Sequence, residues 1–145
     1  YVPQDGRFGY FIMVDVDWFK DINDHYGHPE GDRVLKEVAR NLREIFQEDS
    51  LIGRLGGDEF AVLLYTPTSR EELEVLLRHF QDRVRRITWE KRRSTCSAGA
   101  LPILRRDLPE EYYRDADQLL YLAKEQGRDR FVIGAPDEEE PALDP

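Results

Sequence analysis

The stretch GRLGGDEF, residues Gly53–Phe60, separates two apolar runs, each as long as a strand, at residues 51–55 and 60–65. Two such runs split by a pair of glycines predict a β-hairpin, because glycine takes the positive φ angles of a tight turn without strain. The predicted turn presents two carboxylates, Asp58 and Glu59. Acidic hairpin tips are also common as plain solvated surface, so the function of this pair depends on the rest of the chain.

The composition is that of one acidic domain. The chain has 145 residues, enough for a buried core without disulfides, and a net charge of -9. This charge argues against binding duplex nucleic acid through the overall field, since phosphate binding needs a basic face. The single cysteine, Cys96, excludes a disulfide framework, and no apolar run approaches a membrane span. We therefore expect a cytoplasmic domain with no nucleic acid partner and no membrane contact of its own.

The residues before the hairpin predict a loop, a strand, a connection and a helix. Residues 1–9 predict a lead-in loop, and the continuous apolar run 10–14 predicts a central strand covered on both faces. This strand ends in Asp-Val-Asp at residues 15–17, where the carboxylates are either metal ligands or an ordinary solvated strand end. Residues 18–28 predict a polar and aromatic connection. Pro29 then begins a helix with one apolar face that runs to about Gln47.

The residues after the hairpin predict a second helix. Ser69, followed three residues later by Glu72, is a capping-box signature, and an apolar stripe with helical spacing follows it. A basic group lies at residues 83–93. In so acidic a chain we interpret this group as a solvated helix end rather than a nucleic-acid patch.

The last third of the domain predicts a strand, a helix and a strand. Residues 94–101 suit a strand that Pro102 ends, and a charged loop at 105–111 leads to a helix from about Asp115 to a stop at Gly127. Residues 130–133 predict a short last strand. We expect one domain over residues 1–135 and an acidic tail without fold at 136–145.

The predicted order of elements resembles the palm of nucleotide polymerases and class III nucleotide cyclases. That fold is α+β, with a central antiparallel-mixed sheet flanked by helices and the signature motif on a β-hairpin. Palm sites hold divalent metals between carboxylates on neighbouring strands, and the metals promote transfer of a phosphoryl group to a 3′-hydroxyl. Asp15, at the end of one strand, and Asp58, on the hairpin, are the candidate pair.

Several spaced motifs narrow the resemblance to the GGDEF family of diguanylate cyclases. DVDWFKDIND begins at Asp15, and RLGGDEF occupies residues 54–60. The match covers roughly residues 8–133, and several motifs in the correct order make chance agreement improbable. Further matching pairs lie at residues 27–28, 31–32, 116–117, 123–124 and 127–128, together with Tyr121.

The resemblance implies a site for GTP and for Mg²⁺ (or Mn²⁺). Asp15, the carbonyl of Val16 and Asp58 correspond to the metal ligands, and Asp58, Lys20 and Glu59 correspond to catalytic positions. Lys20 would stabilise charge on the phosphates, and Glu59 is a candidate base or second metal ligand that ranks below Asp58. The positions that correspond to substrate binding are Phe19, Asn23, His28, Asp32, Gly56, Gly57, Lys124 and Arg128.

Chemistry supports the implied roles of two groups of substrate positions. Asp32 can accept from the N1–H and amino group of guanine, and Asn23 can both donate and accept at that edge. Lys124 and Arg128, four residues apart at a helix end, correspond to residues that grip the terminal phosphate. The helix dipole favours cations there whatever their function.

The chain also departs from the family pattern. Gln47 and Ser50 stand where the family's product-inhibition motif has an arginine and an aspartate, so we expect that site to be lost. Asp129 stands where asparagine is usual. The family's opening helix is missing, and we expect a chain clipped at its front and an upstream sensor or regulatory domain.

Three hypotheses follow. In the first, a second GGDEF domain joins this one, each holds one GTP, and the homodimer makes cyclic di-GMP and two pyrophosphates. In the second, the domain is a catalytically silent GTP-binding regulatory module. In the third, it is a plain α+β interaction domain, which explains the composition but not the ordered motifs.

Overall fold

A computed structural model describes residues 6–47, 49–103 and 109–136. A five-stranded sheet with the order β2-β3-β1-β6-β7 forms its centre. Only β6 and β7 are parallel, and the other neighbours are antiparallel. The strands are β1 (Arg7–Val16), β2 (Ser50–Gly56), β3 (Glu59–Ser69), β6 (Cys96–Ile103) and β7 (Arg130–Ile133), and a separate small ribbon pairs β4 (Thr88–Trp89) with β5 (Arg92–Arg93).

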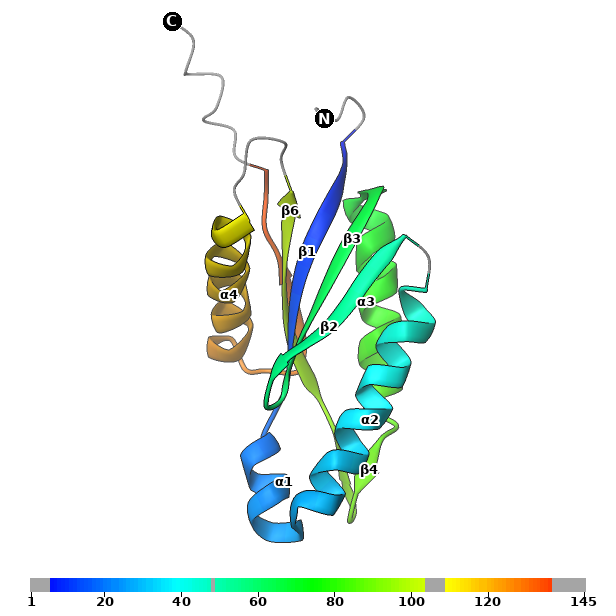
Figure 1. Cartoon of the computed structure of the whole chain (residues 1–145), viewed down its shortest axis with the longest axis vertical. Coiled ribbons are helices and arrows are strands. Elements are labelled where there is room, and N and C mark those ends of the chain that lie inside the picture. The colour runs from blue at the N-terminus through cyan, green and yellow to red at the C-terminus, as the bar shows by residue number, and fades with distance from the viewer. Residues whose placement is uncertain (1–5, 48, 104–108, 137–145) are drawn as a thin grey trace, which may run out of the picture.

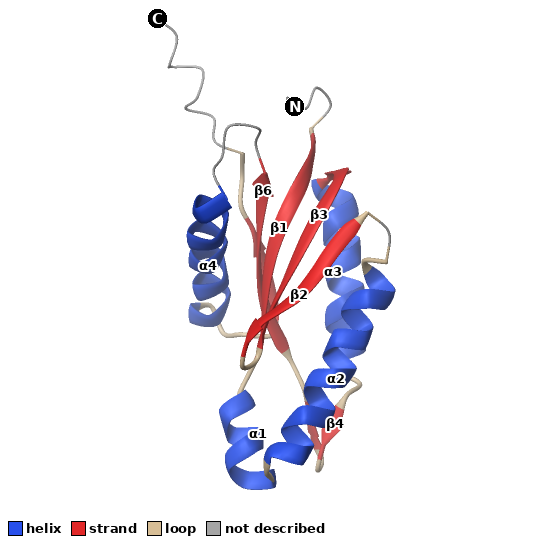
Figure 2. Ribbon diagram, viewed as in Figure 1, coloured by secondary structure: helices blue, strands red, loops and turns tan. Residues whose placement is uncertain are grey.

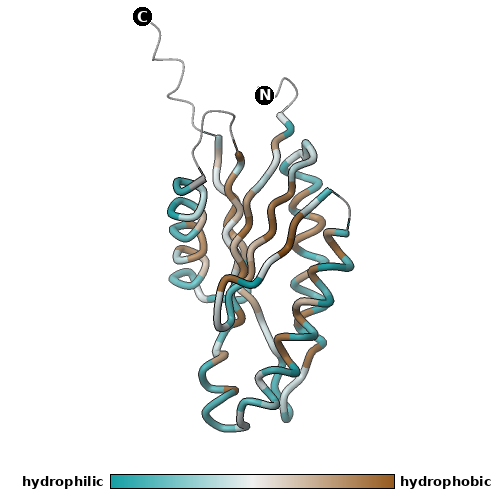
Figure 3. Tube along the Cα trace, in the orientation of Figure 1, coloured by the Kyte–Doolittle hydropathy of each residue, from teal (hydrophilic) through white to brown (hydrophobic). Residues whose placement is uncertain are grey.

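Helices cover both faces of this sheet. Helices α2 (His28–Ile45) and α3 (Arg70–Val84) lie on one face and α4 (Pro109–Glu125) on the other, while the short α1 (Phe19–Tyr26) lies beyond the end of β1 (Figures 1 and 2). The strands are mostly apolar and the outward sides of the helices are hydrophilic (Figure 3). The predicted α+β fold, with a mixed central sheet flanked by helices, is therefore confirmed.

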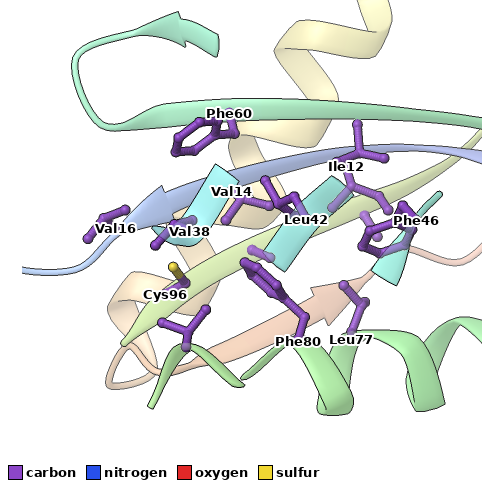
Figure 4. Close-up of a cluster of buried hydrophobic side chains, with 14 of the residues drawn as sticks. Ile12, Val14, Val16, Val38, Leu42, Phe46, Phe60, Leu77, Phe80 and Cys96 are labelled. Atoms are coloured by element: carbon purple, nitrogen blue, oxygen red, sulfur yellow. The ribbon is translucent and has the colours of Figure 1, made fainter. Parts of the chain in front are cut away.

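Strand β1 is buried on both faces, as its continuous apolar run predicts. Ile12 and Val14 point into the cluster formed with α2 and α3, where Leu42 and Phe80 pack (Figure 4). Met13 points the other way, to a smaller cluster under α4. Because successive side chains of a strand alternate between faces, Asp15 lies on the α4 side, at the end of β1.

Close packing of α4 on β6 depends on one glycine. A Cβ atom built on Gly99 would lie 2.4 Å from the backbone nitrogen of Leu120 and 2.7 Å from the carbonyl oxygen of Ala116. Any larger residue would push α4 away from the sheet. Gly99 thereby helps to hold the end of α4, which carries Lys124, close to β1.

Several sequence predictions are confirmed. The hairpin forms from β2 and β3, and the last strand has the predicted bounds. Ser69 caps α3: its hydroxyl accepts from the backbone nitrogen of Glu72, and the Glu72 carboxylate accepts from the backbone nitrogen of Ser69. The helix predicted from Pro29 is α2, which begins one residue earlier.

Other predictions are wrong in their bounds. Residues 7–9 belong to β1 rather than to a loop, and the predicted connection at 18–28 contains α1. Of the residues of α1 only Ile22 is buried, so its apolar pattern is too sparse to indicate a helix. Helix α4 begins at Pro109, before the predicted Asp115.

Pro102 does not end its strand. It lies within β6, paired with Tyr10 of β1. Pairing with β7 stops at Ala100, so β6 is an edge at Pro102, where a missing N–H is tolerated. Residues 104–108 of the predicted charged loop, and the predicted tail from residue 137, lie outside the described residues. Within the described ranges, no helix is long and apolar enough to cross a bilayer.

Candidate functional site: a carboxyl pair beside a cationic turn

The hairpin turn lies beside the end of β1. Asp15 is paired with Glu59 of β3, and the backbone nitrogen of Val16 donates to the carbonyl of Asp58 over 3.2 Å. Only Asp58 of the two predicted turn acids lies in the turn, because Glu59 is already the first residue of β3. Gly57, at φ 44°, takes the left-handed conformation that the turn requires.

Arg54 holds the turn from inside the hairpin. Its Nε and Nη2 donate to the carbonyl oxygen of Gly57 over 2.9 and 2.6 Å. The arginine of the signature stretch therefore has a local structural role that its position in the sequence did not disclose. It fixes the backbone that carries Asp58.

Asp15 is a buried carboxyl with an unusual environment. Its Oδ2 forms an ion pair with Lys124 Nζ of α4, and its buried Oδ1 has no hydrogen-bond partner among the described residues. Burial, followed by the adjacent carboxyl of Asp58, raises the pKa of Asp15 to about 7, and Lys124 opposes that rise. Two carboxyls in contact resist double ionisation unless a cation lies between them.

Lys124 and Glu59 respond to the same acidic surroundings. Burial lowers the pKa of Lys124, but the contact with Asp15 and the charges of Asp58 and Glu59 together outweigh it, so the net shift is upward. Burial also raises the pKa of Glu59, and the charges of Asp117 and Asp58 raise it further. The pKa values of Asp15 and Glu59 stay raised although Lys124 lowers both, so the lysine neutralises the carboxyls at this edge only in part.

A cavity of about 330 Å³ opens beside the carboxyl pair. Arg128 reaches it from the turn after α4, with its Cζ 4.4 Å from the centroid of the Trp18 ring, a cation–π contact. Lys20 also lines it, although its Nζ pairs with Asp24 over 3.0 Å. The cavity is lined by residues 15–21, Asp58, Lys124 and Arg128, so acids and cations share one hollow.

The donors at this edge fit a hard divalent cation. Carboxylate and carbonyl oxygens are the ligands that Mg²⁺ and Mn²⁺ prefer. Oδ1 of Asp15, which has no hydrogen-bond partner among the described residues, is available as a metal ligand beside Asp58. The described residues contain no group of three or more Asp, Glu, His or Cys side chains that could hold a metal. A metal here would need ligand oxygens from its substrate or from water in addition to the protein.

A second group of predicted residues lies between α1 and α2. Asn23, on α1, has a buried Oδ1 without a hydrogen-bond partner among the described residues. A Cβ on Gly31 of α2 would lie only 2.0 Å from this oxygen and 3.2 Å from Cζ of Phe19. Gly31 is thus a functional candidate that the sequence pattern indicated only as part of a motif. Its neighbour Asp32 is exposed on α2.

The structure does not bring every predicted residue to the cavity. Six predicted residues do not line it: Gly56, Gly57, Glu59, Asn23, Asp32 and His28, the last of which is the first residue of α2. Asp17 does line it, but both its carboxylate oxygens already accept hydrogen bonds from protein donors. Of the two strand-end acids weighed as metal ligands, Asp15 alone has an oxygen without a hydrogen-bond partner.

Two proteins of Escherichia coli are similar to this chain in sequence. The chain is 39% identical over 132 residues to the probable diguanylate cyclase DgcT of Escherichia coli, covering 86% of this chain and 29% of that protein. It is 35% identical over 130 residues to the cyclic di-GMP phosphodiesterase PdeR of the same organism, covering 87% of this chain and 20% of that protein. The chain thus spans less than a third of the length of these relatives.

A solved structure has the same fold. The active GGEEF domain of a diguanylate cyclase from Vibrio cholerae superposes with a TM-score of 0.79 at 32% identity, covering 89% of this chain and 84% of that one. The family model described as diguanylate cyclase, GGDEF domain, matches residues 3–130. With the signature hairpin, the carboxyl pair and these matches in agreement, the chain belongs to the GGDEF family.

Proposed function

We propose that this chain is the catalytic domain of a diguanylate cyclase, which condenses two GTP molecules into cyclic di-GMP and two pyrophosphates. The observation that carries the proposal is that Asp15, in an ion pair with Lys124, lines one cavity together with Asp58 and Arg128. A silent GGDEF domain is expected to lack signature acids, and this chain keeps them.

Each residue at the cavity has a role that its chemistry supports. Asp15, Asp58 and the carbonyl of Val16 would hold Mg²⁺ (or Mn²⁺). When bound, the metal would neutralise charge on the triphosphate. Lys124 and Arg128 would bind the terminal phosphate, which carries the most charge.

Other predicted residues would complete the substrate site. Asn23 and Asp32 would bind the guanine edge, and Lys20 would stabilise charge that develops on the phosphates. Glu59 remains a candidate base because its raised pKa brings it closer to the working pH. His28, Phe19 and the backbone of Gly56 and Gly57 would contact the nucleotide.

The reaction needs two domains. The 3′-oxygen of one GTP attacks the α-phosphorus of the other, pyrophosphate leaves, and the hydroxyl proton is lost; the second linkage forms in the same way. One domain offers one such cavity among its described residues, so two copies would meet face to face. We also propose a cytoplasmic location, where GTP is available, and further domains in the whole protein, since its relatives are much longer.

Incubation with GTP and Mg²⁺, followed by nucleotide separation, tests this function. We expect cyclic di-GMP and pyrophosphate from the wild-type chain, with a rate that rises more steeply than linearly with protein concentration at low concentration. Asp58→Asn should lose at least about a hundredfold in rate, because a metal site with two carboxylates loses one. Circular dichroism should show an unchanged fold, since Asp58 lies in a turn.

The second candidate is a silent GTP-binding regulatory module. It is favoured by one observation, the 35% identity to a relative named as a phosphodiesterase. GTP binding by calorimetry without any cyclic di-GMP, at protein concentrations where the chain is dimeric, would support this module and contradict the cyclase.

A further inference from the structure

The turn that carries Arg128 has an unusual backbone. Gly127, Arg128 and Asp129 have successive φ angles of 126°, 63° and 52°. Two consecutive residues with side chains in the left-handed region are rare, and such conformations persist only when the surroundings hold them. The contacts around this turn therefore decide where Arg128 lies.

One such contact comes from the end of β1. The backbone nitrogen of Asp129 donates to Oδ2 of Asp17 over 3.0 Å. Asp17 is only 4% exposed and is itself fixed, because its carboxylate accepts from Thr95 Oγ1 and Ser97 Oγ, each over 2.7 Å. A buried carboxylate with this many donors is a rigid anchor. It ties the turn to the strand that carries Asp15.

Besides the hydrogen bonds from the backbone nitrogen of Arg128 to Ala123 O and from Arg130 Nε to Arg128 O, a further contact comes from the end of α3. Arg85 Nε lies 3.1 Å from both carboxylate oxygens of Asp129, and Arg85 Nη1 lies 3.1 Å from Oδ1 of Asp82. The side chains of Arg85 and Asp129 are each only about a third exposed, at 34% and 35%. An asparagine at 129 would carry no charge to pair with Arg85. This ion pair therefore exists because aspartate stands at 129 where asparagine is usual. Arg85 is not among the residues that line the cavity.

Arg85 and Asp129 do not line the cavity, but the turn that they hold carries Arg128, which does. The α4–β7 connection lies at the same end of the sheet as the β2–β3 hairpin (Figure 1). From that turn the Arg128 guanidinium stacks on Trp18 and faces the cavity of Asp15 and Asp58. A shift of the turn would therefore move the guanidinium relative to the carboxyl pair.

We propose that Arg85 and Asp17 are positioning residues that hold the Arg128 turn, through Asp129, so that Arg128 meets the terminal phosphate of the nucleotide. This inference rests on the proposed function for the identity of the nucleotide. The contacts of Asp17 and Arg85 with Asp129, which we call the brace, do not depend on that function. Because Arg85 touches no group in the cavity, its loss should affect only the contact that Arg128 makes.

Arg85→Gln in the full chain is the primary test, and Arg83→Gln is its matched control. Arg83 lies in the last turn of α3, two residues before Arg85, and its replacement removes the same charge, but it pairs with Glu44 of α2. Two readouts are needed: the affinities for a non-hydrolysable GTP analogue and for GDP, both with Mg²⁺, and the NMR resonance of the Arg128 Nε–H group. That resonance is assigned by its loss in Arg128→Lys, and stacking on Trp18 should displace it.

The expected result is a selective loss. Arg85→Gln should weaken binding of the GTP analogue about threefold to fivefold, the range of a partly exposed ion pair, and leave GDP binding unchanged. Arg85→Lys should restore part of the loss, and Asp129→Asn should reproduce it without adding to Arg85→Gln. The Arg128 resonance should move in Arg85→Gln and stay in place in Arg83→Gln.

Two results would overturn the proposal. If the ratio of the affinity for the GTP analogue to the affinity for GDP is the same in Arg85→Gln and Arg83→Gln, these contacts do not contribute to binding of the terminal phosphate. If the Arg128 resonance is unchanged in Arg85→Gln, the brace does not position Arg128 at all. Failure of the proposed function is distinct: the wild type would then make no cyclic di-GMP from GTP, while the Arg128 resonance would still report on these contacts.

Discussion

Lys124 at the end of α4 forms an ion pair with Asp15 at the end of β1, and this contact is made at the carboxyl whose pKa is most clearly displaced toward neutrality. The lysine favours the ionised carboxylate, whereas burial and Asp58 favour the protonated acid. The balance lies on the protonated side, with a pKa of about 7. The neighbouring carboxyls at this edge of the sheet are thus destabilising when both are ionised, unless further positive charge lies beside them.

Asp15→Asn should stabilise the metal-free fold at high pH. The pKa of Asp15 is higher when folded, about 7 against 3.8, so the folded state binds more protons and the free energy of unfolding falls as pH rises through that window. Replacing the carboxyl removes this penalty, which already includes the opposing effect of Lys124 and is on the order of a few kcal/mol at pH 8. Thermal denaturation in EDTA at pH 8 and pH 4 measures it.

The gain in Tm should be present at pH 8 and much smaller at pH 4, where Asp15 is protonated in the folded state and about half protonated in the unfolded state. Glu90→Gln, at an exposed carboxyl between β4 and β5, is the control and should change neither value. A lower Tm for Asp15→Asn at pH 8 would show that the pair with Lys124 outweighs the cost of burial.

Gly31→Ala should damage nucleotide binding through Asn23. The added Cβ would lie 2.0 Å from Asn23 Oδ1 and 3.1 Å from its Cγ, so the amide must move. Loss of its hydrogen bond to the base should weaken GTP binding by about tenfold, and isothermal titration with Mg²⁺ measures this. Asn23→Ala in the same chain should relieve the clash and restore Tm without restoring affinity. Unaltered GTP affinity in Gly31→Ala would refute the role of Asn23.

Asp32→Ser should relax the choice of base. An adenine edge offers no N1–H to a carboxylate, so ATP binding by the wild type leaves Asp32 unpaired, at a cost of about 1 to 3 kcal/mol. We expect GTP to compete at least tenfold better than ATP with the wild type, and the ratio to fall in Asp32→Ser. Equal competition with the wild type would count against base recognition by Asp32.

Cyclic di-GMP should bind weakly at the segment before β2. Gln47 is exposed, and the Ser50 hydroxyl donates to the carbonyl of Phe46, so neither supplies the paired charges of the family's inhibition motif. Losing these contacts should weaken binding at least tenfold. Titration of the product into the chain should find no tight site away from the GTP cavity, and Gln47→Arg with Ser50→Asp should create one. Sub-micromolar binding by the wild type would contradict this.

Local patterns in the sequence were enough to predict much of the fold. The hairpin around Gly56 and Gly57, the capping box at Ser69 and the last strand depend on neighbouring residues, and the structure confirms them. Helix α1 was not predicted, because a helix of eight residues with one buried side chain is stabilised by its contact with α2 and not by an apolar periodicity of its own. The prediction that Pro102 ends its strand was wrong, because a proline is tolerated within β6 at a position where β7 no longer pairs with it.

The sequence by itself determined which acids and cations this protein carries and in which family pattern they occur. Only the tertiary structure decided how they meet. Asp15 and Asp58 come together because β1 and β3 pair, and Lys124 joins them because α4 packs on β6 through Gly99. Asp17 and Arg85 both contact Asp129, from 112 and 44 residues away in the sequence. Pairings between residues far apart in sequence arise from burial and register, which no local pattern of residues contains.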